Sequence, residues 1–291
     1  MSTPSVNDKV QLDAPTLQYL LNVDIASERS DFMDAFLLGK LGSMEAHRKI
    51  QFALRQNGVG DLFLDNVSRI IILSDETQGS QESKTKGSQG PDVISDLTQY
   101  AVAISRWVVR RGHAQCAPFL CSYHKQRAID HGAEQRHLVG LLRSLCYLIL
   151  ATDVMATATY TLPAHKAQTS QSGHHRYLLS LLSLLVRNLL NSGRSLVCVI
   201  DSLHLLERED SGEFWELMGV LIRIVLEAQK ADSGSSVKIV LLWPTSWSAS
   251  LYTGCVKVRI SEEMIRTNEV KLDDDMTIRT QDIDDILTRR I

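Results

Sequence analysis

One stretch of the chain limits its fold more than any other: an uninterrupted apolar run that ends at an acid. The run extends from Leu196 to Ile200, and Asp201 closes it. Such a run predicts a parallel strand that is buried on both faces. In nucleotide-binding α/β folds, ligands bind at the carboxyl end of such strands, where an acid can hold Mg²⁺ directly or through water. The sequence therefore predicts a central strand with Asp201 at the end where a ligand would bind.

Strands and helices alternate along most of the remaining chain. Apolar runs predict further strands over residues 69–73, 118–123, 237–243, 255–260 and 269–272. Helical periodicity predicts helices over residues 92–110, 136–151, 177–191, 213–230 and 280–290. This alternation requires a mainly parallel sheet covered by helices on both faces. The expected fold class is therefore α/β.

The N-terminal region differs in pattern from this α/β region. Residues 1–14 are polar and are expected to form a disordered tail. Residues 15–60 have helical periodicity, so a helical N-terminal segment is expected there, followed by the α/β domain over residues 61–291. Within that domain, residues 152–173 are rich in Thr, Ala, Ser and Gln and are expected to form a loop.

Composition excludes several classes of protein. The 291 residues are 44% hydrophobic and 22% charged, with a formal net charge of −3, which gives no electrostatic reason to bind nucleic acid or an anionic membrane. The five cysteines are few and odd in number, which favours a reducing compartment. The N-terminus lacks the apolar core of a signal peptide, and no apolar stretch is long enough to span a bilayer. We expect a cytoplasmic protein with neither nucleic acid nor membrane as a partner.

A glycine- and serine-rich segment follows the first predicted strand. Residues 74–91 contain no large apolar side chain, which predicts a flexible surface loop. Because the segment lies between a strand and a helix, it also has the position of a phosphate-binding loop. Lys84, Thr85 and Lys86 are then the candidate phosphate-binding residues. However, the motif Gly-x-x-x-x-Gly-Lys-Ser/Thr occurs nowhere in the chain, and several residues separate Lys84 from the start of the predicted helix.

Several stretches resemble motifs of one protein family, and they occur along this chain in the same order as in that family. Residues 140–150 look like a helix written "GLLRSLLYQIL", and residues 195–207 look like a Walker B strand ending in "DALDE" or "DGLDE". Residues 237–246 are similar to the sensor strand "IKICVSSRP", which places a sensor residue beside the phosphates. In this combination the chain resembles the NACHT-type NTPase domains of the signal-transducing ATPases common in filamentous fungi. The resemblance implies a P-loop NTPase-like fold.

Three departures from this family pattern bear on function. The Walker A motif is absent, and the second group of acids after Asp201 is replaced by Leu203, His204 and Leu205. In the sensor strand, Trp243-Pro-Thr-Ser replaces "SSRP", so the arginine is missing. In that family the missing acids position the attacking water. We therefore predict a catalytically degenerate module without hydrolytic activity or a required cofactor, which acts in signalling or as a scaffold by binding a protein partner or by self-association.

The alternative is a nucleotide-binding switch with an unorthodox phosphate loop at residues 74–91. It would bind ATP or GTP, with Asp201 as the Mg²⁺ ligand and Ser202 beside the phosphates. It requires Lys84 or Lys86 to contact a phosphate near Asp201. In the degenerate alternative, Asp201 is a structural carboxylate that caps a helix.

Two other kinds of site have weaker support from the sequence. A serine or cysteine nucleophile would need a Gly-x-Ser-x-Gly elbow or a similar glycine-rich turn, and the chain contains neither. Cys116 and Cys121 lie between His113 and His124, but their spacing matches no standard zinc motif, so we expect core cysteines and surface histidines.

Aromatic and basic residues raise two questions about the surface. Trp215 lies on a periodic helix and is expected in the core, whereas Trp243 and Trp247 are candidates for an exposed patch that binds a partner. Arg106, Arg110 and Arg111, beside Trp107, are expected to form a solvated helix end. His204 is expected to be a surface or core histidine and no catalytic base.

Overall fold

The computed structural model describes part of the chain, and the fold is given for that part. The described residues are 9–23, 32–35, 50, 54, 59–75, 96–112, 114–121, 138–152, 155, 158–163, 175–204, 211–230, 234–243 and 255–260. The predicted strand over residues 269–272 and the predicted helix over residues 280–290 lie outside these ranges, as does most of the predicted loop over residues 74–91.

Five parallel strands form the main sheet. In chain order they are β2 (Arg69–Asp75), β3 (Ala114–Leu120), β5 (Ser195–Asp201), β6 (Val237–Trp243) and β7 (Cys255–Ile260). Their order across the sheet is β3-β5-β6-β2-β7, and all neighbours are parallel. The predicted α/β fold with a mainly parallel sheet is therefore confirmed. The apolar strand β5 lies inside the sheet as expected, but the middle strand is β6, whose residues are all buried.

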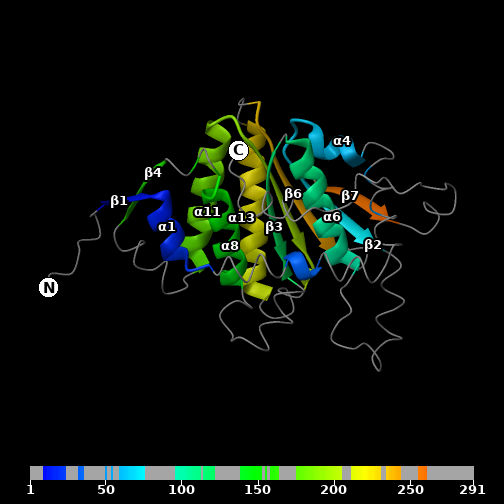
Figure 1. Cartoon of the computed structure of the whole chain (residues 1–291), viewed down its shortest axis with the longest axis horizontal. Helices are drawn as coiled ribbons and strands as arrows, with labels where there is room; N and C mark the ends of the chain where they lie inside the picture. The colour runs from blue at the N-terminus through cyan, green and yellow to red at the C-terminus, as the bar shows by residue number, and fades with distance from the viewer. Residues whose placement is uncertain are drawn as a thin grey trace, which may run out of the picture.

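Helices cover both faces of this sheet. They are α1 (Ala14–Leu21), α4 (Val59–Leu64), α6 (Asp96–Arg111), α8 (Leu138–Leu150), α11 (His175–Asn191) and α13 (Ser211–Lys230). From β2 to β3 the chain crosses the sheet in one direction. From β3 to β5, and again from β5 to β6, it moves in the opposite direction. Since such crossovers are right-handed, α6 covers one face, and α8, α11 and α13 cover the other. Figure 1 shows α8, α11 and α13 in one layer with α1 outside them.

A second, two-stranded sheet was not expected from the sequence. Strand β1 (Lys9–Asp13) pairs antiparallel with β4 (Thr159–Pro163). The predictions of a disordered tail over residues 1–14 and of a loop over residues 152–173 are therefore wrong for these ten positions. Each strand alone is short and carries no apolar run, so its hydrogen-bonding partner could not be inferred locally. Asp13 ends β1 and caps α1 by accepting the Thr16 N–H at 2.8 Å. Hydrogen bonding to the Thr16 side chain, and then to the Thr16 N–H, lowers the pKa of the Asp13 carboxyl group.

Strand β3 forms one edge of the main sheet and contains a proline. Among the described strands it pairs with β5 alone, with Pro118 opposite Val199. An edge strand tolerates proline because one side of its backbone needs no N–H donor. The prediction of a strand over residues 118–123 was wrong in its bounds: the strand ends at Leu120, and Cys121 is helical.

The amino end of the sheet is fixed by a buried lysine. The side chain of Lys238 is 2% exposed, and its Nζ donates to Ser236 Oγ at 2.8 Å and to the Asp65 carbonyl oxygen. The Asp65 carboxylate lies 3.5 Å from the same Nζ. Burial lowers the pKa of Lys238, and the neighbouring Asp65 carboxylate acts in the opposite direction. These contacts hold the end of α4 against β6, at the end of the sheet opposite Asp201.

Candidate functional site

The carboxyl end of β5 meets the first turn of α6 through one hydrogen bond. Thr98 Oγ1 donates to Asp201 Oδ2 at 2.6 Å, across a sequence separation of 103 residues. Both side chains are 0% exposed. The topology explains the contact, because α6 follows β2 and begins at the carboxyl edge of the sheet, where β5 ends. A hydrogen bond to a buried carboxylate is short and strong, so this pair connects α6 to the centre of the sheet.

The residue after Asp201 turns the chain sharply out of the sheet. Ser202 has a φ of 47°, in the left-handed region, and its side chain is buried. Its N–H donates to the Leu242 carbonyl oxygen of β6 at 3.1 Å. This conformation is unfavourable by about 1–2 kcal/mol for a residue other than glycine. The hydrogen bond to Leu242 connects the turn after β5 to the end of β6.

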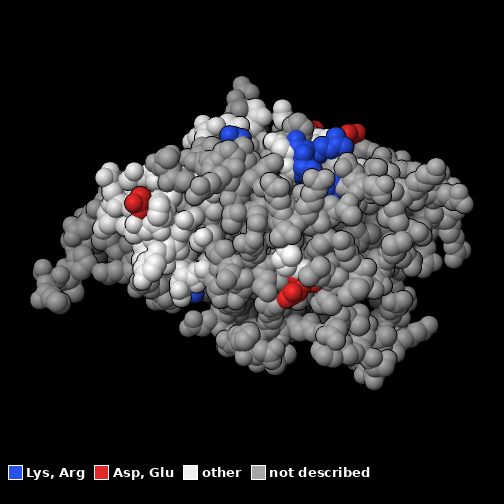
Figure 2. Space-filling model, in the orientation of Figure 1, with Lys and Arg blue, Asp and Glu red and all other residues white. Residues whose placement is uncertain are grey.

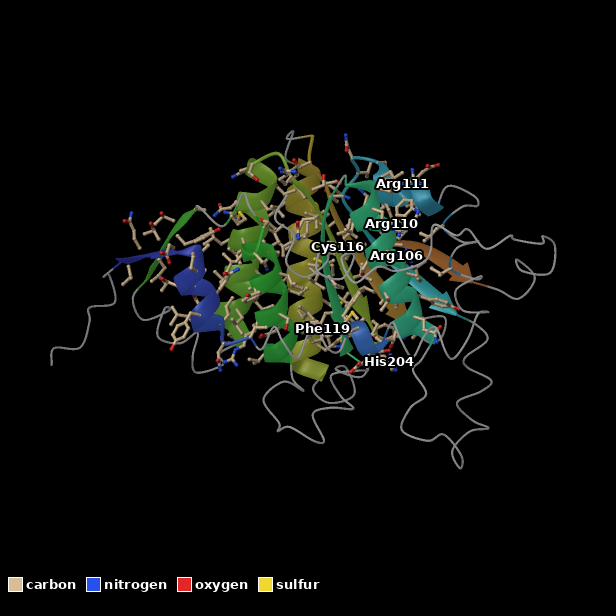
Figure 3. The ribbon with its side chains drawn as sticks, in the orientation of Figure 1. Arg106, Arg110, Arg111, Cys116, Phe119 and His204 are labelled. Atoms are coloured by element: carbon tan, nitrogen blue, oxygen red, sulfur yellow. The ribbon has the colours of Figure 1, made fainter. Side chains whose placement is uncertain are left out.

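An aromatic group fills the other face of the same sheet end. The His204 and Trp243 rings meet edge to face with centroids 5.6 Å apart, and Phe214 of α13 lies 6.3 Å from Trp243. Trp243 is 4% exposed and His204 is 8% exposed. Figure 3 labels His204 at the carboxyl end of the strands. His204 is therefore buried in the core, one of the two positions expected for it.

Two of the tryptophan predictions were wrong. Trp243 is buried under Phe214 and so belongs to no exposed patch, because α13 covers the face of β6 from which Trp243 projects. Trp215, which was expected in the core, is 42% exposed and packs edge to face against Phe214 at 5.1 Å. Trp247 lies outside the described residues.

The structure brings together only part of the predicted nucleotide site. Lys84, Thr85 and Lys86 lie outside the described residues, while Asp201 and Ser202 lie at the predicted sheet end. Sequence reasoning missed Thr98, the residue that contacts Asp201. Its signal was weak but present: a hydroxyl side chain in the first turn of the helix that follows the first strand of the sheet.

The cysteines do not form a metal site within the described residues. Cys116 and Cys121 are buried, whereas His113 and His124 lie outside the described ranges. No group of three or more His, Cys, Asp or Glu in the described part of the chain could hold a metal ion. Burial raises the pKa of Cys116 to about 12 and that of Cys198 to about 12, so both remain neutral thiols at pH 7.

These raised pKa values predict a loss of stability at alkaline pH. The contribution of each thiol is fully present below the unfolded pKa of 9.0 and is lost as pH rises toward the folded pKa of about 12. We expect the free energy of unfolding to fall between about pH 9 and pH 11, and to fall less steeply in the double variant Cys116→Ala/Cys198→Ala. Urea denaturation at a series of pH values measures both slopes. Equal slopes in the two proteins would show that these thiols do not titrate on unfolding.

The expected cluster of three arginines divides into one buried and two exposed residues. Arg106 is 1% exposed, whereas Arg110 and Arg111 are exposed, so the prediction of a solvated cluster was wrong for Arg106. All residues from Leu97 to Arg106 are buried, including the polar ones. The Arg111 guanidinium lies 5.3 Å from the centroid of the Trp107 ring. Figures 2 and 3 place the basic surface at the end of α6 remote from His204, so it does not belong to the candidate site.

The comparisons with known proteins found no relative of this chain. No protein-family model matches the chain, and neither a curated protein nor a solved structure matches it. Among the helices in the described part of the chain, none combines the length and the apolarity needed to cross a membrane.

Proposed function

We propose that this protein is a catalytically degenerate NTPase-like module that acts in signalling or as a scaffold through protein contacts. The observation that supports this proposal most directly is the buried hydrogen bond from Thr98 to Asp201. In P-loop NTPases a Ser/Thr hydroxyl at the start of the P-loop helix and the Walker B aspartate together hold Mg²⁺. Here the two corresponding side chains bond to each other in a site closed to solvent.

The residues around Thr98 differ from those that bind phosphate. Aligning Thr98 with the last position of the Walker A motif places Leu97 at the lysine and Asp96 at the second glycine. Leu97 is 2% exposed and carries no charge to neutralise a phosphate. The residues present therefore do not fit a Mg²⁺–nucleotide complex.

The position of β6 supports the same proposal. Strand β6 lies between β2 and β5. A sensor strand must lie at that position, because the phosphates would be held between a loop after β2 and an acid after β5. This strand order supports the proposal that the sheet is NTPase-like. At the end of β6, however, the buried Trp243 packs on His204 in place of a polar sensor residue.

Titration with ATP and with GTP, each with Mg²⁺, tests this proposal. We expect isothermal titration calorimetry to show no saturable binding at nucleotide concentrations up to about 1 mM, where even a weak site would be half occupied. The matched variants are Lys84→Ala and Asp201→Asn, each checked for folding by thermal unfolding. Micromolar binding to the wild type that either variant abolishes would refute the proposal and support the nucleotide-binding switch with its loop at residues 74–91.

A further inference from the structure

We draw no further inference here: the strongest candidate, the groove between α11 and α13 with Val186, Leu190, Ile224 and Ala228 in its lining, supports no proposal, because nothing in the described part of the chain shows what covers it.

Discussion

Replacing Thr98 by valine should lower the free energy of unfolding by about 2 kcal/mol. Valine has nearly the shape of threonine but cannot donate a hydrogen bond, so the Asp201 carboxylate loses its 2.6 Å contact while remaining buried. Leaving a buried charged acceptor short of a donor is unfavourable by about 1–3 kcal/mol. Urea denaturation at pH 7, with the slope m checked for constancy, measures the change.

Two further variants separate the hydrogen bond from other effects at this position. Thr98→Ser keeps the hydroxyl and should retain most of the stability that Thr98→Val loses. In the double variant Thr98→Val/Asp201→Asn the losses should not add, because the two residues form a single interaction. If Thr98→Val leaves stability unchanged, the bond does not stabilise the folded state, and Asp201 remains available to an ion. That result would remove the main support for a degenerate site.

Replacing Trp243 by alanine should have a larger effect, about 3–5 kcal/mol of unfolding free energy. The ring fills the space between His204 and Phe214 at the end of β6 and is almost fully buried. Its removal creates a cavity in a region already bounded by the sheet and α13. Thermal and urea unfolding, followed by far-UV circular dichroism, would measure the loss. Trp243→Phe, which keeps an aromatic ring, should lose much less.

The matched control for Trp243 is Trp215. Because the Trp215 ring is 42% exposed, Trp215→Ala should destabilise the monomer far less than Trp243→Ala does. A large loss in Trp215→Ala and a small one in Trp243→Ala would reverse the assignment of core and surface.

The main sheet was predictable from the sequence because its central strands are buried on both faces. Strand β5 contains the apolar run Leu196–Ile200 and β6 is apolar apart from Lys238, and β6 was predicted with its observed bounds. The ribbon of β1 and β4 was not predictable, because its hydrogen bonds connect segments that are distant in sequence and individually unremarkable. The burial of Arg106 was missed for a similar reason: the helix pattern does not show that the polar side of α6 is also covered.

The candidate site was only partly predictable. Asp201 was found because it ends an apolar run, and that signal is local. Thr98 has only a weak local signal, since glycine and lysine do not precede it, and the crossover from β2 to β3 brings it to Asp201. Lys84 and Thr85 were candidates because their segment lies between a predicted strand and a predicted helix. Residues that meet only through the topology of the sheet, as Thr98 and Asp201 do, carry no shared sequence pattern by which they could be found.

Pro118 affects whether further chains can add to the main sheet at the edge formed by β3. An exposed strand edge is a template on which further chains can add, strand by strand, toward fibres. A strand arriving beside β3 would meet a residue without an N–H donor near the middle of that edge. Strand-by-strand addition of further chains is therefore hindered at the β3 edge of the sheet.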